Sequence, residues 1–454
     1  MNSLNRQHLT ALVAREQDRY RTQHPASREL YERSTHLFAR VPMTWMNKWS
    51  GGFPLGFSGA AGAVVTDLDG HELIDFALGD TGAMAGHSPA PLTRALHERV
   101  GVNGGVTTML PTEDAQWVAA ELARRFGLAQ WSFTLSATDA NRWLLRLVRL
   151  VSARPKILVF SYSYHGSVDE TFVVCDDQGQ AMSRPGNVAP AVDPTTTTRV
   201  VEFNDLAALE RELAHGDVAA VLTEPALTNI GIVLPEPGFL EGVRAACDAT
   251  GTLLILDETH TFSAGPGGAT RRFNLRPDAL TIGKSLGGGV PCGAYGLSQD
   301  LADRVLAAVS EGADIVDVGG VGGTLAGNAL SFSAMRAVLG EVLTDEAFAP
   351  MEMLATTFAQ GVQATIDAHE LDWSVSQLGA RCEYRFARPA PRSGGESATS
   401  ADPLLEEYLH LYLINRGVLL TPFHNMALMC PATTPAQVAR HQVLFDEAVG
   451  ELTS

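Results

Sequence analysis

The sequence predicts an α/β fold with a mostly parallel sheet. Between about residues 116 and 330, segments with helical periodicity alternate with short segments that are apolar without alternation. Uninterrupted apolar strands are typical of parallel sheets that helices cover on both faces. The chain has 454 residues, of which 45% are hydrophobic, so it can bury one large core and a smaller second one. We therefore expect a large α/β domain with a smaller lobe.

The N-terminal segment, up to about Phe38, has the pattern of a polar helix. Its narrow apolar stripe consists of Leu9, Leu12 and Val13. A stripe this narrow cannot form a core by itself, so we expect the segment to pack on another part of the chain.

The stretch GAVVTDLDGHELIDFA predicts a β-hairpin around the turn Asp69-Gly70. Asp67, Asp69 and Gly70 also resemble the start of a calcium-binding loop, but the later ligands of such a loop are missing. We therefore favour a simple turn.

The central segments follow one another as strand-helix units. Helices are predicted in VAAELARRFGL, DANRWLLRLVRLVSA and FLEGVRAACDATG, and strands in KILVF, DVAAVLTEP and TLLILDETH. After Ser331 come a helical stretch, the loop ARPAPRSGGESATSADP, and then helix, strand and helix. The loop is rich in Pro, Gly and Ser, so we expect an exposed connection. The predicted parts are residues 1–70 (contributing to the small lobe), 71–330 (large domain) and 331–454 (small domain).

Composition excludes several classes of protein. The formal charge of −18 is spread along the chain, which disfavours nucleic acid and anionic membranes as partners. The first residues carry no apolar run that would predict a signal peptide or membrane span. The cysteines are odd in number and show no C-x-x-C pair, which argues against a disulfide framework and a zinc site and favours the cytoplasm. They are Cys175, Cys247, Cys292, Cys382 and Cys430.

Two charged residues follow neighbouring predicted strands. Asp257 ends the apolar run TLLIL, and Lys284 comes after the next strand-like run, just before a run of glycines. Ligands of such folds bind at the carboxyl ends of the strands, so both side chains should face one crevice. A nucleophilic lysine with a carboxylate nearby suits pyridoxal phosphate (PLP), whose pyridinium nitrogen pairs with an acid. A structural ion pair is the alternative that these two residues leave open.

Other stretches suit the same cofactor, although each has an ordinary structural explanation. TLSATDANRW offers a helix start where Ser136, Ala137 and Thr138 can meet a phosphate, but simple N-capping explains it equally well. Tyr164 in SYSYHG follows a strand and can stack on a ring or merely pack. Thr324 in GGVGGTLAGN can bring a hydroxyl to a phosphate oxygen.

The order of these motifs resembles the class III aminotransferases, the ω-transaminase and glutamate-1-semialdehyde aminomutase group of fold-type I PLP enzymes. The resemblance runs from DLDGHELIDF through Gly86-His87 and Glu224-Pro225 to the C-terminal lobe. It is most specific in DETHTFSAG and in GKSLGGGVPCGA. It implies a large domain with a mixed, mostly parallel seven-stranded sheet, a smaller α+β lobe and a homodimer with shared active sites.

Carried over to this chain, the resemblance implies that Lys284 forms the covalent link to PLP and that Asp257 pairs with the pyridine nitrogen. The phosphate would lie at Ser136, Ala137 and Thr138, Tyr164 would stack on the ring, and Thr324 would reach the phosphate of the neighbouring subunit. Two positions depart from the family. SATD stands where SGTE is usual, and Thr259 stands where a valine often lies under the ring. Glu224 could tune the pocket, and His165 is interpreted as structural.

The substrate residues are predicted from aromatic patches. Trp45, Met46 and Trp49 lie in PMTWMNKWSGGFPL, and Phe423 and His424 lie in TPFHNMALMCP. Related mutases hold a carboxylate with an arginine in the first of these loops, where Lys48 is the only cation here. Arg40, Arg381 and Arg385 are the other candidate anchors.

The resemblance predicts an aminotransferase that moves an amino group between an amine or amino acid and a keto acid or aldehyde, in ping-pong fashion. The alternatives are an aminomutase like glutamate-1-semialdehyde 2,1-aminomutase, an amino acid racemase and a non-catalytic PLP-binding protein. A nucleotide-dependent oxidoreductase is disfavoured because no G-x-G-x-x-G opens a helix after an early strand.

Overall fold

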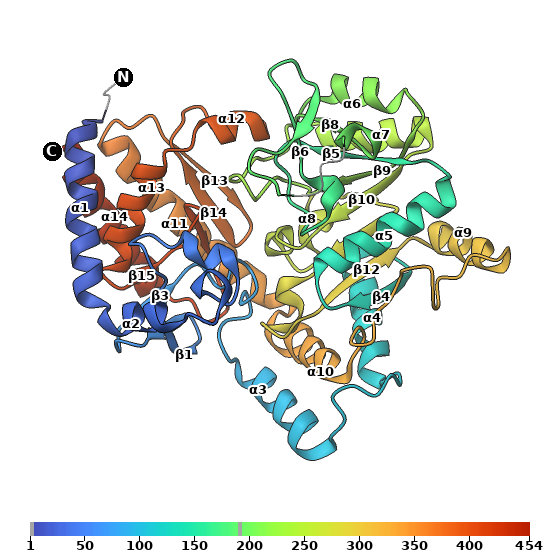
Figure 1. The fold of residues 1–454 in the computed structure, drawn as a ribbon, viewed down its shortest axis with the longest axis horizontal. Helices are drawn as coiled ribbons and strands as arrows, with labels where there is room; N and C mark the ends of the chain where they lie inside the picture. Colours follow the sequence, from blue (N-terminus) through green and yellow to red (C-terminus); the bar gives the residue numbers. More distant parts are fainter. Residues whose placement is uncertain (1–3, 189–192) are drawn as a thin grey trace. The chain divides into compact units, whose positions relative to one another are not determined.

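The computed structural model describes residues 4–188 and 193–454 (Figure 1). The chain divides into two compact units. Unit 1 is made of the residues up to Pro89 together with 349–390 and 400–454, and unit 2 is made of 90–348 and 391–399. The boundaries expected from the sequence, after residues 70 and 330, lie earlier. Residues 71–89 belong with unit 1 because they contain a strand of its sheet.

Unit 2 is built on a seven-stranded sheet (Figure 1). β12 runs antiparallel to both of its neighbours, and the remaining pairs are parallel. This confirms the predicted mixed, mostly parallel sheet. In spatial order the strands are β4 (Gln130–Thr134), β12 (Gly293–Leu297), β11 (Ala279–Ile282), β10 (Leu253–Asp257), β9 (Val218–Thr223), β5 (Lys156–Phe160) and β8 (Thr198–Val201).

Helices cover both faces of this sheet, which explains its unbroken apolar strands. In β5, Ile157 and Val159 join the core that contains α5 (Ala137–Ser152) and α9 (Gln299–Ser310). Leu158 and Phe160 instead join the core that contains α6 (Leu206–Leu213) and α7 (Phe239–Thr250). Successive side chains of a strand point to opposite faces, so both faces must be apolar.

Unit 2 also contains further helices and a two-stranded sheet. They are α3 (Ala90–His97), α4 (Glu113–Phe126), α8 (Gly268–Arg272), α10 (Ala329–Ala337), α12 (Gly394–Thr399), β6 (Val173–Cys175) and β7 (Ala181–Ser183).

The loop expected as an exposed connection is partly ordered and buried. It contains α12, in which Gly394 and Ser397 are buried. Gly394 lies so close to the carbonyl of Ser161 that a Cβ would clash with it. Asn204 donates from Nδ2 to the carbonyl oxygen of Arg392 at 2.8 Å. The Gly and Ser content of this segment predicts an exposed loop. In the structure, one of those glycines, Gly394, is needed for close packing against Ser161.

Unit 1 combines helices with two small sheets. α1 packs on α13, and Leu9, Leu12 and Val13 are buried, which confirms the packing predicted for the N-terminal stripe. The helices are α1 (Arg6–Gln23), α2 (Pro25–Arg33), α11 (Phe348–Ala368), α13 (Pro403–Ile414) and α14 (Pro435–Thr453). One sheet has the order β1 (Phe57–Ala61), β2 (Val64–Asp67), β3 (Glu72–Asp75) and β15 (Val418–Leu419); the other consists of β13 (Ser374–Leu378), β14 (Arg381–Arg385) and β16 (Met426–Leu428).

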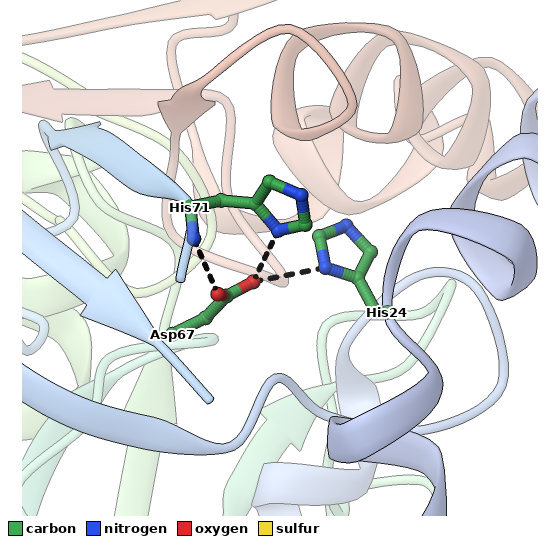
Figure 2. A group of neighbouring side chains, drawn as sticks. All are labelled: His24, Asp67 and His71. Atoms are coloured by element: carbon green, nitrogen blue, oxygen red, sulfur yellow. Dashed lines mark hydrogen bonds and ion pairs between the residues drawn. The ribbon is translucent and has the colours of Figure 1, made fainter. Parts of the chain in front are cut away.

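The predicted hairpin is formed by β2 and β3, and its turn is organised by Asp67 rather than by a calcium loop. Asp67 Oδ1 accepts the N–H groups of Asp69 and His71 at 2.9 and 2.8 Å. Its Oδ2 lies 2.9 Å from Nδ1 of His24 and 3.0 Å from Nδ1 of His71 (Figure 2). Four nitrogen atoms thus occupy the carboxylate, and the cluster is explained by hydrogen bonding.

All five cysteines are free thiols, in agreement with the sequence analysis. Among the described residues, no helix combines the length and apolar character needed to cross a membrane.

Candidate active site

Lys284 and His260 follow the carboxyl ends of the adjacent strands β11 and β10. The two strands are parallel, and Asp257 is paired in register with Thr281. His260 and Lys284 each lie three residues beyond these partners. Their side chains meet, with His260 Nε2 2.7 Å from Lys284 Nζ.

Lys284 has an unusual backbone conformation. Its φ of 44° lies in the left-handed region, which costs a non-glycine residue about 1–3 kcal/mol. Strained residues of this kind cluster at functional sites. The preceding residue, Gly283, packs against the start of α5, since a Cβ there would lie 3.0 Å from the Ala137 nitrogen. The sheet edge that carries Lys284 therefore adjoins the predicted phosphate-binding helix start.

Asp257 is buried and held by several donors. Its Oδ2 accepts from Asn141 Nδ2 at 2.9 Å and lies 3.0 Å from His165 Nδ1, while its Oδ1 accepts from the Thr259 N–H at 3.0 Å. Burial opposes ionisation, but the contacts with His165, Thr259 and Asn141 outweigh it and hold the pKa of Asp257 below its usual value. The carboxylate is therefore ionised at neutral pH.

Two residues in this cluster had no assigned role in the sequence analysis. Asn141 donates to Asp257 and to the carbonyl oxygen of His165, and its own Oδ1 accepts from Thr281 Oγ1 at 2.8 Å. His260 contacts Lys284. In the sequence, Asn141 could have been noticed as a polar residue on the apolar face of a predicted helix. His260 could have been noticed because it follows the end of β10 by three residues, as Lys284 follows Thr281.

The start of α5 has the features of an anion site. Ser136 caps the helix, with its Oγ accepting from the Asp139 N–H at 3.2 Å. The N–H groups of Ala137 and Thr138 belong to the first turn, where a helix supplies no acceptor. Thr138 Oγ1 accepts from the Ser167 N–H at 3.0 Å. A phosphate could therefore be held by the helix terminus.

Tyr164 and Glu224 are joined to each other. The Tyr164 N–H donates to Glu224 Oε1 at 3.3 Å, and Thr228 also hydrogen-bonds to this carboxyl group. Burial raises the pKa of Glu224. The ring of Tyr164 packs edge-on against Phe172 at a centroid distance of 6.3 Å. Tyr164 is only partly buried, which leaves part of its surface available to a ligand.

The group around Asp257 fits a bound polar ring. Thr259 Oγ1, Ser163 Oγ and His165 Nε2 are buried side-chain atoms without a hydrogen-bond partner among the described residues. Unpaired buried polar atoms are costly, and a ligand with several acceptors and donors would satisfy them. An ionised Asp257, a lysine amine and a helix start within one unit match the ring nitrogen, aldehyde and phosphate of PLP.

Thr324 lies apart from this group. It is exposed on the connection between α9 and α10.

The predicted substrate residues all belong to unit 1, and several surround one cavity. The cavity has a volume of about 420 Å³, and Lys48, Trp49, Glu406, His410 and Phe423 are among its lining residues. Lys48 Nζ lies 5.3 Å from the centre of the Phe423 ring, and Trp45 packs edge-on against the same ring at 5.2 Å. Burial lowers the pKa of His410 to about 4, so its imidazole is neutral at pH 7.

His424 does not line this cavity. It is buried with its Nδ1 3.2 Å from Glu383 Oε1.

The candidate arginines are engaged elsewhere. Arg381 is buried and hydrogen-bonded to Thr81, and Arg385 donates to Ser400 Oγ at 3.1 Å. Arg40 is exposed and donates to the carbonyl oxygen of Glu32 at 3.2 Å. Lys48 is thus the one predicted cation among the residues that line the cavity.

Comparisons with known proteins show which family the chain belongs to. A sequence profile of the class-III aminotransferases matches residues 45–445. The chain is 31% identical to a glutamate-1-semialdehyde 2,1-aminomutase of Gemmatimonas aurantiaca, over 92% of this chain and 97% of the relative. It is similar to crystal structures of a glutamate-1-semialdehyde-aminomutase from Pseudomonas aeruginosa PAO1, with a TM-score of 0.96 and 48% identity over 99% of both chains; one of these is in complex with PMP.

A more distant similarity is to an omega-transaminase from Sphaerobacter thermophilus, with a TM-score of 0.82 and 25% identity over 94% of this chain and 98% of the other. The profile match and the curated relative both extend over most of the chain. The chain therefore belongs to the class-III aminotransferase family and is a PLP-dependent enzyme of fold type I.

Proposed function

We propose that the enzyme moves an amino group within one substrate, as an aminomutase acting on a small amino-aldehyde carboxylic acid such as glutamate 1-semialdehyde. The observation that carries this proposal is the 48% identity, over 99% of both chains, to the glutamate-1-semialdehyde-aminomutase of Pseudomonas aeruginosa PAO1. The curated relatives carry the corresponding name. This support favours the aminomutase alternative over transfer between two substrates.

PLP, when bound, supplies an aldehyde carbon to which amines attach and a ring that accepts electrons from the neighbouring carbon. Lys284 would form the link to the cofactor and, when released, would carry a proton between carbon atoms of the substrate and cofactor. Asp257 would hold a proton on the ring nitrogen, since its carboxylate is ionised and rigidly oriented. Asn141 and His165 would keep that carboxylate in place.

The rest of the cofactor shell follows from the contacts in unit 2. The helix start at Ser136, Ala137 and Thr138 would hold the phosphate, and Tyr164 would lie against the ring. Thr259 would place its hydroxyl under the ring, where it can donate a hydrogen bond that valine cannot.

The substrate carboxylate would be held by Lys48. This residue lines the cavity in unit 1 with Trp49 and Phe423, which offer an apolar wall for the substrate chain. A single flexible ammonium binds a carboxylate less specifically than the bidentate guanidinium of an arginine. We therefore expect a modest preference for one carboxylate substrate over another.

Exposed apolar residues support a homodimer. Val102, Met109 and Leu110 on one segment and Val316 and Val318 on another are between 69% and 88% exposed. The exposed Thr324 lies on the second of these segments. A second copy would bury this apolar surface and would bring Thr324 to the partner's phosphate, as the family resemblance implies. Dilution to monomers should therefore release PLP and abolish activity together.

The test of the function uses one substrate and no amino acceptor. Purified enzyme with PLP is incubated with glutamate 1-semialdehyde, and the product is followed by chromatography. Catalytic formation of 5-amino-4-oxopentanoate without release of ammonia or of a free dicarbonyl product supports the aminomutase. If turnover stops after one equivalent and resumes only when a keto acid is added, the enzyme is a transaminase. One observation favours this second function: among the described residues that line the cavity, Lys48 is present and arginine is absent.

A further inference from the structure

We propose that Arg184 binds the carboxylate of the substrate. This inference rests on the proposed function in taking the substrate to be a carboxylic acid, and it names a second cation besides Lys48 for that carboxylate. Arg184 was not among the anchors considered from the sequence. Those arginines, Arg40, Arg381 and Arg385, are engaged elsewhere in unit 1.

Arg184 lies beside the expected cofactor shell in unit 2. It directly follows β7, and its N–H donates to the carbonyl oxygen of Phe172 at 2.9 Å. The ring of Phe172 packs on Tyr164, the residue expected to lie against the cofactor ring. The groups that interact electrostatically with the guanidinium of Arg184 are Tyr162, Tyr164 and Glu224. A ligand bound at Tyr164 would therefore have this cation as a neighbour.

The ring of Tyr162 is the platform for the guanidinium. Cζ of Arg184 lies 5.4 Å from the centre of this ring, within the range of a cation–π interaction. Tyr162 has a φ of 63°, in the left-handed region, and a Cβ on Gly394 would lie 3.0 Å from the Tyr162 Cβ. Strained residues of this kind cluster at ligand sites. Because stacking uses the flat face of a guanidinium, its N–H edge stays available to an acceptor.

The protein around Arg184 does not match its charge. Within residues 4–188 and 193–454, which the structure describes, the guanidinium makes no hydrogen bond and no ion pair, although it carries five N–H donors. The remaining residues, 1–3 and 189–192, include no acidic side chain. Burial lowers the pKa of Arg184, which shows that the surroundings disfavour the charged form.

Glu224 does not supply the missing charge. Burial raises the pKa of this carboxyl group, which favours its neutral form. Its oxygen atoms instead accept from the Tyr164 N–H and from the Thr228 hydroxyl group. A cation that is partly buried without a partner is unfavourable, and a bound anion would offset that cost.

Arg125 shows how a buried arginine of the same unit is satisfied without a ligand. Burial lowers its pKa as well. Its guanidinium donates to Glu121 Oε1 at 2.7 Å and to the carbonyl oxygens of Leu339 and Leu343 at 2.9 and 3.0 Å. Arg184 differs because its donors are left to solvent or ligand, and the residue is partly exposed, so a ligand can reach it. An arginine binds both oxygens of a carboxylate side by side, which makes a carboxylic acid the matching ligand.

The cofactor phosphate is the other anion expected in this unit. The helix start at Ser136, Ala137 and Thr138 offers it backbone N–H groups. The substrate carboxylate has no such place in unit 2 apart from Arg184. Measurements on both anions therefore separate the two possible occupants of the guanidinium.

The test compares a carboxylate with an uncharged molecule of similar shape. The PLP-loaded full chain is titrated with pentanoate and with pentanamide, and both dissociation constants are measured by calorimetry. The proteins are wild type, Arg184→Gln, Arg184→Lys and Lys48→Gln. Tyr162→Phe is the control that keeps a ring beside the guanidinium. The affinity of each protein for PLP is measured first, by titration of the unloaded chain.

We expect wild type to bind pentanoate at least about tenfold more tightly than pentanamide, because hydrogen bonds between charged groups contribute this much. The preference should persist in Tyr162→Phe and vanish in Arg184→Gln. It should be smaller in Arg184→Lys, which keeps the charge but not the planar fork. No preference in wild type, or an unchanged preference in Arg184→Gln, would overturn the inference.

Two further outcomes would reassign the anion. A preference that is lost in Lys48→Gln and kept in Arg184→Gln would place the carboxylate at Lys48. If Arg184→Gln keeps the preference but binds PLP more than about tenfold more weakly, Arg184 serves the cofactor phosphate. Either result would contradict the inference.

Turnover of glutamate 1-semialdehyde separates failure of this inference from failure of the proposed function. In Arg184→Gln, KM should rise at least about tenfold while kcat changes less than about threefold, because the contact is made equally before and during the reaction. If wild type does not isomerise this substrate, the proposed function is wrong, and the pentanoate comparison still tests Arg184. If wild type does so and the KM of Arg184→Gln stays within about threefold of it, only the inference is wrong.

Discussion

Two strand-ending aspartates in this molecule have similar partners and different expected roles. Asp67 in unit 1 and Asp257 in unit 2 are both buried, and each accepts imidazole and backbone N–H groups. Burial opposes ionisation of both, yet neighbouring donors hold both pKa values below the usual range. The difference lies in the surroundings. Asp257 ends a parallel strand beside the one that leads to Lys284, whereas Asp67 closes a hairpin (Figure 2).

This comparison shows that a carboxylate-histidine cluster is not by itself a sign of catalysis. Such a cluster stabilises a turn in unit 1, and the same chemistry in unit 2 is placed where a ligand can use it. Topology, rather than the local donor set, separates the two.

The largest effect should come from Lys284, which has no counterpart near Asp67. Lys284→Ala should abolish turnover and the visible absorption band of the lysine-bound cofactor, while the helix start at α5 retains some PLP. The band is measured by absorption spectroscopy after reconstitution. An unchanged band in the variant would show that another group forms the link.

Asp257→Asn should lower turnover by about a hundredfold or more, because the amide cannot stabilise a charged ring nitrogen. Folding and PLP binding should survive, since an amide oxygen can still accept from Asn141 or Thr259. Steady-state kinetics and cofactor titration measure the two effects. Turnover close to wild type would remove Asp257 from the site.

Asp67→Asn is the matched control and should act in the opposite way. We expect turnover within about twofold of wild type and a free energy of unfolding lower by about 1–3 kcal/mol, because a buried charged acceptor is lost. Urea denaturation measures this change. A large loss of turnover at unchanged stability would overturn the distinction between the two aspartates.

A histidine without a carboxylate partner should have the smallest effect, visible only in acid. His441 is stacked on Phe358 in unit 1, and burial lowers its pKa to about 3. The folded state therefore favours the neutral ring. Its stabilising contribution is complete above pH 6.5 and declines as the pH falls from 6.5 towards 3, since the unfolded chain takes up the proton first.

Replacing His441 with leucine should therefore make the stability less sensitive to acid. Between pH 7 and pH 5 the free energy of unfolding should fall by about 2 kcal/mol less in His441→Leu than in wild type. Urea denaturation at both pH values provides the measurement. Parallel declines in the two proteins would mean that His441 is protonated in the folded state.

Much of the fold could be predicted from the sequence because the strands of unit 2 are apolar on both faces. That pattern depends on burial alone, so the strands can be predicted without knowing which strands are neighbours. The short helix α12 could not be predicted in the same way. Its residues have loop composition, and the close contact of Gly394 with Ser161 depends on the three-dimensional structure.

The residues of the candidate site also differ in whether the sequence alone can predict them. Asp257 and Lys284 are predictable, because each stands at the end of an apolar run. Asn141 and His260 received no role because their importance depends on which strands are neighbours. Once the register of β10 and β11 is known, the pairing of His260 with Lys284 follows by counting. Arg381 and Arg385, in contrast, are buried among partners that the sequence does not reveal.

The equal spacing beyond β10 and β11 has a consequence for how such enzymes can vary. The connection between the two strands can gain or lose residues beyond α8, after Arg272, without separating His260 from Lys284, because each side chain is tied to its own strand. The stretch before that point is fixed by the hydrogen bonds of Ala269 and Thr270 to Glu258. A single residue inserted between Asp257 and His260, or between Thr281 and Lys284, would shift one partner and leave the other in place. We therefore expect natural or engineered changes in length to be tolerated in the long connection and excluded from these two short intervals.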